Sequence, residues 1–313
     1  MASGVQCPQC GSGAGAELFE AADPLSGDRF AVRRCRDCSL VFVGPPPDKA
    51  RLSTYYPDDY FGRRHRVFNT MFMNLRVRAL PAPGPGARVL DIGCGHGDFL
   101  LACRRHGWQV VGVEQDLAPI LAMEPAPDFE IVGADHLGDL PDASFDVVTM
   151  WHVLEHLAEP RAALAHVRRM LRPGGRFVVE VPNFASWQAR LGPAQWFHLE
   201  VPRHLVHFER DTLRRMLESE GLEPQGWSTF SAEYDAFGLL QSLLNRLCAT
   251  PAYLFQLLIG RGWPGTWRDV IVTTLGVVPL GIVSVLVSIV APLFGRGGVL
   301  RVVAVKPAGT GPA

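Results

Sequence analysis

The fold of this chain is decided by one stretch, Val89-Leu-Asp-Ile-Gly-Cys-Gly-His-Gly-Asp-Phe99. An apolar run ends at Asp91, three glycines follow at alternate positions, and a helical pattern begins at Phe99. Glycine lets the backbone turn with positive φ and leaves no side chain between the main chain and a ligand. A strand, a glycine turn and a helix start form the usual nucleotide-binding corner of an open α/β sheet.

The acidic residues around this turn select the ligand. A dinucleotide fingerprint has glycine at positions one, three and six, whereas the sixth position counted from Gly93 is Asp98. Asp91 and Asp98 would repel a pyrophosphate, but they suit a cationic ligand that has no phosphate. Glu114 ends the next apolar run, at the distance where an acidic side chain binds ribose hydroxyls. We therefore predict S-adenosylmethionine as the ligand, with a structural turn and a nicotinamide or flavin site as alternatives, and expect it to be bound by Asp91, Gly93, Gly95, Gly97 and Glu114.

Three further segments follow the glycine loop in the order found in one enzyme family: Ser144–Met150, Trp151–His156 and Leu171–Asn183. With the loop, they make residues 87–216 similar to the class I S-adenosylmethionine-dependent methyltransferases. The resemblance implies an α/β fold, a doubly wound Rossmann-like sheet of seven strands whose last strand is antiparallel. It also implies that Asp135 contacts the adenine amino group. Trp151, at the carboxyl end of a predicted strand, is expected in the same cofactor site.

Two cysteine pairs predict a metal site near the N-terminus. Cys7 and Cys10 form one C-x-x-C turn, Cys35 and Cys38 form the other, and 24 residues separate the two pairs. Two such turns can close a four-cysteine zinc site, and the alternative is a pair of redox or disulfide couples. We expect a small zinc ribbon over residues 1–44, because so short a segment cannot be stabilised by a hydrophobic core alone.

Length and composition fit one catalytic domain with attachments. The chain has 313 residues, 48% of them hydrophobic, and a formal net charge of −1. No basic tract occurs, so we expect no nucleic-acid partner. The first seven residues have no apolar core, which predicts no secretory signal and a cytoplasmic location. After the ribbon, we expect a linker and helix over 45–86 and the methyltransferase core over 87–235.

A linker segment rich in aromatic residues, Tyr55–Phe61, has two interpretations. It can pack over the cofactor pocket, as similar segments do in related methyltransferases, or it can be a solvated connector with buried aromatic rings.

Histidines after the predicted strands are the candidates for general acid–base chemistry. The run Trp196–Phe208 contains three histidines and an arginine. We predict His204 as the general base, His207 as second choice, and Arg203 as a group that binds an anion on the acceptor. The alternative is a packed loop whose polar side chains bind backbone carbonyls.

His152 is the third catalytic candidate. It precedes Glu155 and His156 where the ubiquinone-biosynthesis O-methyltransferases have a similar segment with Glu in place of His152. In that family these side chains can hold a divalent metal near the acceptor. The alternative is that Glu155 and His156 brace a helix start.

The C-terminal third contains an apolar insertion over residues 236–296. Residues 270–294 carry no charge, and this stretch is long enough for a membrane span. Two tryptophans lie among arginines in the stretch Arg261–Arg268, as at a membrane interface. A final core strand and tail follow over 297–313. A single span would separate this strand from its sheet, so we favour a membrane hairpin or in-plane anchor. The alternatives are one true span and an apolar helix pair packed on the domain or in a dimer.

These observations predict a cytoplasmic, membrane-associated methyltransferase with an N-terminal zinc ribbon. We expect O-methylation of a small-molecule acceptor, an envelope-glycan, lipid-linked or other amphipathic metabolite, with S-adenosylmethionine as cofactor and a structural zinc ion. One alternative is C-methylation of nucleotide-linked sugars, because some such enzymes also carry a four-cysteine module. Another alternative is a non-catalytic module that senses the cofactor or docks a partner.

Overall fold

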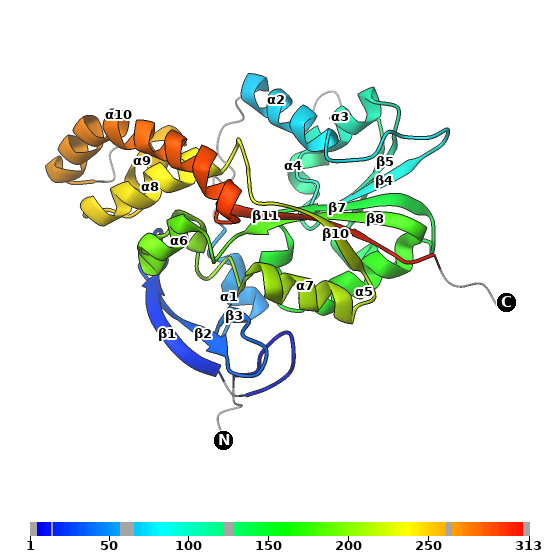
Figure 1. Cartoon of the computed structure of the whole chain (residues 1–313), viewed down its shortest axis with the longest axis horizontal. Coiled ribbons are helices and arrows are strands. Elements are labelled where there is room, and N and C mark those ends of the chain that lie inside the picture. Colours follow the sequence, from blue (N-terminus) through cyan, green and yellow to red (C-terminus); the bar gives the residue numbers. More distant parts are fainter. Residues whose placement is uncertain (1–4, 14, 57–65, 122–127, 261–264, 309–313) are drawn as a thin grey trace.

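A computed structural model describes residues 5–13, 15–56, 66–121, 128–260 and 265–308 of the chain. Its centre is a seven-stranded sheet with the order β10-β11-β8-β7-β4-β5-β6 (Figure 1). The five strands from β8 to β6 are parallel, and β11 is antiparallel to both β8 and β10. The predicted sheet is therefore confirmed; its strands are β4 (Arg88–Ile92), β5 (Gln109–Glu114), β6 (Glu130–Gly133), β7 (Phe145–Trp151), β8 (Leu171–Pro182), β10 (Glu223–Ser228) and β11 (Val299–Val305).

Alternation along the strands gives the sheet two apolar faces. Side chains of successive strand residues point to opposite faces, so Val89 and Leu90 belong to different clusters, as do Val178 and Val179. One face is covered by α2 (Arg66–Val77) and α3 (Asp98–Arg105), and the other by α5 (Pro160–Met170) and α7 (Arg210–Ser219). The layers position the carboxyl ends of the parallel strands at one edge, where ligands bind in this architecture.

Short elements connect the strands. The helix α4 (Ala118–Leu121) follows β5, and a 3₁₀ turn over Ala134–Asp139 follows β6. A 3₁₀ turn over Leu154–His156 follows β7. After β8 come α6 (Trp187–Leu191) and two 3₁₀ turns, Pro193–Gln195 and Phe197–Leu199.

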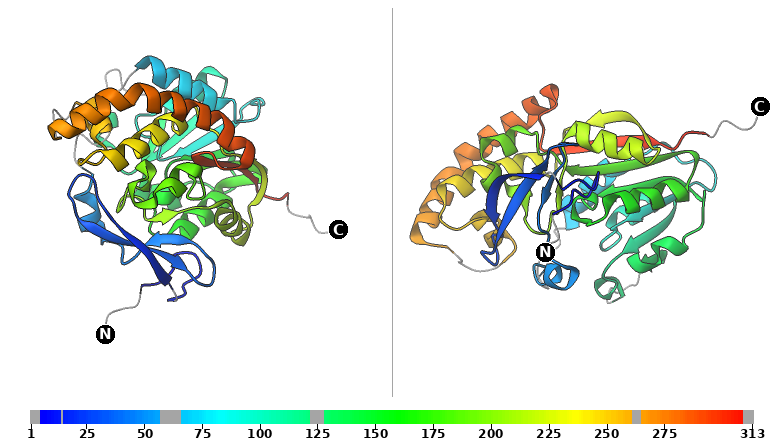
Figure 2. Two further views of the ribbon diagram at one scale, coloured as in Figure 1. Left: turned by 60° about the vertical axis from the view of Figure 1, so that its left-hand side comes forward. Right: turned by 90° about the horizontal axis from the view of Figure 1, so that it is seen from below.

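The N-terminal segment forms a second sheet, and a strand from the core completes it. The order is β1 (Gly15–Ala22), β2 (Arg29–Cys35), β3 (Val41–Val43) and β9 (Val206–His207). Residues 206–207 belong to the histidine-rich run, so this loop pairs directly with the ribbon (Figure 2). The sequence does not predict this pairing, because a two-residue strand has no periodicity.

The linker after the ribbon contains α1 (Lys49–Ser53). Tyr55 is buried and packs edge-to-face on Phe30, and the Tyr56 hydroxyl lies 2.9 Å from His156 Nδ1. The rest of the predicted aromatic segment, residues 57–61, lies outside the described residues. The described part is packed against the ribbon and the core, and whether the segment reaches a cofactor stays a prediction.

The insertion before the last strand is a helical hairpin. It contains α8 (Asp235–Leu247), α9 (Tyr253–Leu258), α10 (Trp267–Val290) and a 3₁₀ turn over Ala291–Phe294. The helices α8 and α10 pack along each other and extend away from the sheet (Figure 1). Since β11 returns to the sheet between β10 and β8, both ends of the hairpin lie at the domain.

Candidate cofactor and acceptor site

The glycine loop is shaped by packing at two positions and open at the third. A Cβ atom on Gly93 would lie 2.3 Å from Val153 Cγ2, and one on Gly97 would lie 2.7 Å from Phe129 Cζ. Both glycines also have φ above +70°. A Cβ on Gly95 would meet nothing within 4 Å, so its backbone faces open space. The loop can therefore receive a ligand against its main chain, as the sequence predicts.

Two carboxyl groups flank this loop at the ends of β4 and β5. Glu114 Oε2 accepts a hydrogen bond from the Gly95 backbone N–H at 2.7 Å. Asp91 is buried and accepts a 2.6 Å bond from the Thr149 hydroxyl. Burial raises the pKa of Asp91 to about 7, although the bond from Thr149 acts in the opposite direction. The loop thus has an acidic wall, which fits a cationic ligand without phosphate.

The other two predicted cofactor residues lie at the same edge but differ in exposure. Asp135 follows β6, and its side chain is largely exposed. Trp151 ends β7, but its ring is buried and packs edge-to-face on Phe99 at 5.4 Å. The guanidinium groups of Arg76 and Arg301 lie over the same ring, at 5.1 and 5.4 Å. The Trp151 side chain therefore supports the site from the core, and its contact with a cofactor stays a prediction.

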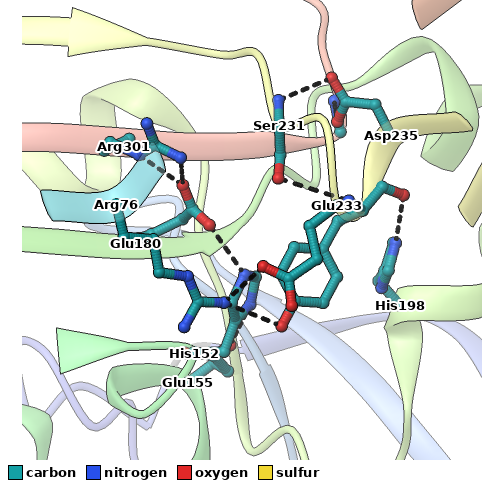
Figure 3. Close-up of polar contacts among 11 residues, drawn as sticks. Arg76, His152, Glu155, Glu180, His198, Ser231, Glu233, Asp235 and Arg301 are labelled. Atoms are coloured by element: carbon teal, nitrogen blue, oxygen red, sulfur yellow. Dashed lines mark hydrogen bonds and ion pairs between the residues drawn. The ribbon is translucent and has the colours of Figure 1, made fainter. Parts of the chain in front are cut away.

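His152 lies directly after β7 in a left-handed conformation, between two buried glutamates (Figure 3). Its Nδ1 lies 3.2 Å from Glu155 Oε1, and its Nε2 lies 3.2 Å from Glu180 Oε1. Burial by itself lowers the pKa of this histidine, but the two carboxylates raise it to about 9. His152 is therefore a doubly protonated cation at neutral pH. In this arrangement both ring nitrogens donate to carboxylates, and a catalytic role of His152 stays a prediction.

More charged groups surround His152. Arg301 Nε donates to Glu180 Oε2 at 2.6 Å, and burial of Glu180 is outweighed by His152 and the arginines, which lower its pKa to about 2. Arg76 donates to Glu233 at 2.8 Å and to the Tyr234 hydroxyl at 3.2 Å. We call these residues the charge cluster: Arg76, His152, Glu155, Glu180, Glu233, Tyr234 and Arg301.

Most residues of the charge cluster are not predicted from the sequence. Glu180 gives a signal, because a charge inside the apolar run of a central strand needs a buried partner. Arg76, Glu233 and Arg301 come from three distant segments, and no sequence pattern indicates that they meet. The cluster connects α2, the strands β8 and β11, the segment after β7 and the loop before α8 (Figure 3).

The two histidines predicted as bases are buried in the loop that pairs with the ribbon. His204 Nδ1 lies 2.9 Å from the His198 carbonyl oxygen and therefore donates to it, which leaves Nε2 unprotonated. Burial lowers the pKa of His204 well below its ordinary value and that of His207 to about 3. Whether either residue accepts a proton in catalysis stays a prediction.

Arg203 is buried by the same packing. Its Nη2 lies 2.8 Å from Asp23 Oδ1, and its Nη1 donates to the Tyr55 carbonyl at 3.1 Å. The predicted anion-binding arginine therefore binds the ribbon's own aspartate, as the alternative of a packed loop expects.

A second cluster of metal-ligand type differs from the predicted one. Ligand atoms of Glu155, His156 and His204 lie within 4.8 Å of one another. Glu155 Oε2 is buried and has no hydrogen-bond partner among the described residues. His152, expected in this group, is instead directed to Glu155 and Glu180, and His204 takes its place.

The four ribbon cysteines come together as predicted. Ligand sulfurs of Cys7, Cys10, Cys35 and Cys38 lie within 4.8 Å of one another, and two of the sulfur pairs are 3.5 Å apart. Sulfurs bound tetrahedrally to zinc at about 2.3 Å lie about 3.8 Å from one another, so the donor set fits a zinc ion. The residues after each pair, Gly11 and Ser39, both have positive φ, which gives the two turns the same shape.

One residue, Leu205, joins the ribbon to the core through its backbone. Val43 N–H donates to the Leu205 carbonyl at 2.9 Å, and Leu205 N–H donates to the Glu155 carbonyl at 2.8 Å. The ribbon strand β3 is thus two hydrogen bonds away from the charge cluster. The position of the histidine-rich loop depends on the ribbon.

Comparison with known proteins agrees with this geometry. A family model described as a methyltransferase domain matches residues 63–225, just over half of the chain. The chain belongs to the class I S-adenosylmethionine-dependent methyltransferase family. The match includes the glycine loop and most of the charge cluster, whereas the four-cysteine ribbon and the hairpin lie outside it.

Two curated relatives illustrate the family. The chain is 33% identical over 151 residues to a ubiquinone biosynthesis O-methyltransferase of Idiomarina loihiensis. The aligned region covers 44% of this chain and 62% of the relative. The chain is 34% identical over 173 residues to a probable S-adenosylmethionine-dependent methyltransferase of Mycolicibacterium smegmatis, which covers 53% of this chain and 60% of the relative. The chain therefore spans less than two thirds of the length of these relatives.

A solved structure shares the fold. The crystal structure of the [4+2]-cyclase SpnF has a TM-score of 0.50 and 20% sequence identity, covering 79% of this chain and 84% of the cyclase. At this identity the likeness shows the fold alone.

Removing the charge of His152 is expected to destabilise the fold. His152→Ala leaves Glu155 and Glu180 buried without this counter-charge, and we expect a loss of about 3–5 kcal/mol in the free energy of unfolding. Urea unfolding followed by circular dichroism measures it. His136→Ala, at an exposed histidine, is the control and should change the free energy little. Equal values for both variants would contradict the buried cation.

The same cation predicts a dependence on pH. Because the folded pKa of His152 is about 9 and its ordinary value is 6.5, its contribution is complete below pH 6.5 and is lost as the pH rises to 9. The free energy of unfolding of the wild-type protein should fall over this range more than that of His152→Gln. If the free energies of unfolding of the two proteins changed equally with pH, the raised pKa of His152 would be contradicted.

Loss of the zinc ligands should loosen the histidine-rich loop. Cys35→Ser combined with Cys38→Ser should remove one zinc ion per chain and raise amide hydrogen exchange over residues 204–208, because β9 pairs with β3. Metal analysis and exchange mass spectrometry measure the two effects. Cys248→Ser, outside the ribbon, is the control and should keep both properties of the wild type.

Proposed function

We propose that the chain transfers the methyl group of S-adenosylmethionine to an acceptor. The observation that carries this proposal is the open glycine loop between Asp91 and Glu114 in a chain of this family. Glu114, at the end of β5, would bind the ribose hydroxyls, and Asp91 would supply negative charge toward the cationic part of the cofactor. When bound, the cofactor supplies the electrophilic methyl group, and the protein must hold the acceptor behind it.

We further propose a hydroxyl acceptor, with His204 as the group that takes its proton. His204 carries its proton on Nδ1, so Nε2 has the free lone pair that a base needs. Its low pKa suits an acceptor whose hydroxyl is itself acidic, such as a phenol or an enol. The charge cluster has an even balance of arginine or histidine cations and glutamates, so the buried charges do not by themselves require a charged acceptor.

We propose that the ribbon binds a structural zinc ion and that the chain divides near residues 44, 86, 235 and 296. The coordination set of four cysteines supports the zinc. The packing of residues 45–86 between the ribbon and the core supports a connecting role for that segment.

We also propose that the hairpin attaches the protein to a membrane surface. Among the described residues one helical segment, Trp267–Phe294, has the length and apolar character to cross a bilayer. Only 11% of its most apolar stretch is buried within the protein. A helix packed on a soluble domain has apolar residues facing inward and polar residues facing solvent, and this helix has the reverse arrangement. The inward positions carry Asp269, Thr273, Ser284 and Ser288, whereas large apolar side chains such as Leu275 and Ile282 are exposed.

The return of β11 to the sheet supports a hairpin or in-plane anchor over a single span. Trp267, at the start of α10, is 78% exposed, as expected of an interfacial tryptophan, while Trp263 lies outside the described residues. An apolar surface of this kind favours an amphipathic or lipid-linked acceptor, which the protein would meet at the membrane.

Two alternatives keep specific support. The ribbon supports C-methylation of nucleotide-linked sugars, because some enzymes with that activity also carry a four-cysteine module. A non-catalytic module that binds the cofactor is favoured by the full burial of the predicted bases, His204 and His207. Cofactor binding without product formation from envelope extracts would select this last alternative.

Asp91 should control cofactor affinity. Asp91→Asn is expected to weaken S-adenosylmethionine binding by about tenfold or more at pH 8, because one charge-assisted contact is lost. Since the pKa of Asp91 is about 7, wild-type affinity should rise between pH 6 and pH 8, and this rise should be smaller in the variant. Isothermal titration calorimetry measures both, with Glu130→Gln on exposed β6 as control. Unchanged affinity in Asp91→Asn would contradict the proposed site.

Charges on the outer face of α10 should release the protein from lipid. We expect the wild-type protein to float with vesicles of phosphatidylethanolamine and phosphatidylglycerol, and the double variant Leu275→Glu, Ile282→Glu to remain unbound, because charges are costly in hydrocarbon. Leu18→Glu, at an exposed leucine of β1, is the control. Wild-type protein that stays with the soluble fraction would contradict the anchor.

A further inference from the structure

A cavity of about 370 Å³ lies where the ribbon, the histidine-rich loop and the hairpin meet. It is distinct from the glycine loop, because none of its lining residues belongs to β4, β5 or β7. Its walls come from the turn after β1, from residues 194–203 and from α9. The volume lies within the range of small-ligand pockets.

The walls of the cavity are mainly apolar. Leu25 comes from the ribbon, Phe197 and Leu199 from the loop, and Phe255 and Ile259 from the end of the hairpin. The rings of Phe197 and Phe255 meet at 5.3 Å, edge to face. This lining favours a hydrocarbon over a sugar or a nucleotide, which would need several polar partners.

Several polar groups of the lining are bound within the protein. Asn245 donates to the Gln195 carbonyl at 3.0 Å, and Gln256 donates to the Pro251 carbonyl at 2.9 Å. Glu20 and Arg29 pair with each other at 3.0 Å and are exposed at the rim. Trp196 Nε1 is buried and has no hydrogen-bond partner among the described residues. The apolar walls therefore suit a ligand with an apolar body.

The loop that forms one wall of the cavity also faces the charge cluster. Trp196 and Phe197 line the cavity, while the next residue, His198, lies against Tyr234 with ring centroids 5.9 Å apart. Gly238 of α8 lies against His198 so closely that a Cβ there would be 2.2 Å from its Nε2. The cavity and the proposed acceptor side are thus separated by the thickness of a single loop.

We propose that this cavity binds the apolar chain, acyl or prenyl, of a lipid-like acceptor. The proposal rests on the proposed function, since it assigns the acceptor class of the same enzyme. The continuity of the lining with the hairpin supports it. Phe255 of α9 and the next residue after this helix, Ile259, line the cavity, and Leu258 of α9 is 60% exposed. A chain leaving a bilayer at the hairpin would meet apolar surface up to the cavity.

Binding of dodecanoate to the full-length, zinc-loaded protein tests the proposal. Isothermal titration calorimetry should show one saturable site per chain, and Ile259→Trp, which fills the cavity, should weaken binding at least tenfold. Ile282→Trp, on the exposed face of α10, is the matched control and should bind dodecanoate as the wild type does. Leu25→Trp fills the cavity from the ribbon side and replaces Ile259→Trp if that variant does not fold.

The outcomes separate the cavity from the proposed function. Absence of a one-to-one site in the wild-type protein, or equal affinity in both cavity-filling variants and the wild type, would overturn the proposal. A loss in Ile282→Trp as large as in Ile259→Trp would show that the probe binds the outer face of the hairpin and would also overturn it. S-adenosylmethionine binding is measured on the same samples, so that its failure beside intact dodecanoate binding would contradict the methyltransferase function alone.

Discussion

Two backbone hydrogen bonds at Leu205 connect the parts of this molecule. They join the ribbon strand β3 to the histidine-rich loop and that loop to Glu155, next to the buried cation His152. The ion pair of Arg203 with Asp23 adds a second tie between the same parts. A ribbon too small to hold its shape by a hydrophobic core thereby fixes a loop beside the proposed acceptor side, and a zinc ion in the ribbon would stabilise both.

The hairpin imposes a different constraint on function. Its long helix places small polar residues inward and large apolar residues outward, the reverse of a helix that covers a soluble core. Because the chain returns from this helix to the sheet between β10 and β8, the hairpin and the catalytic domain stay on one side of any surface it touches. The cavity beside α9 is separated from the charge cluster by a single loop.

The sequence was sufficient to predict the sheet and the two ligand loops, since both depend on local patterns. Alternating glycines between Asp91 and Asp98 and the paired cysteines act through residues close in the chain. The charge cluster could not be predicted, because Arg76, Glu180 and Arg301 meet only through the order of the strands. The predicted roles of His152 and Arg203 treated them as free side chains, whereas burial beside glutamates and Asp23 gives each a structural partner.

The central claim is that the acidic glycine loop receives a cationic adenosyl compound. A crystal structure of the protein with S-adenosylhomocysteine, the demethylated cofactor, tests it most directly. The account predicts the ribose hydroxyls against Glu114, the backbone of Gly95 along the ligand, and the adenine next to the segment of Asp135. Density for the compound elsewhere, or a loop that holds a nicotinamide or flavin nucleotide instead, would contradict the account.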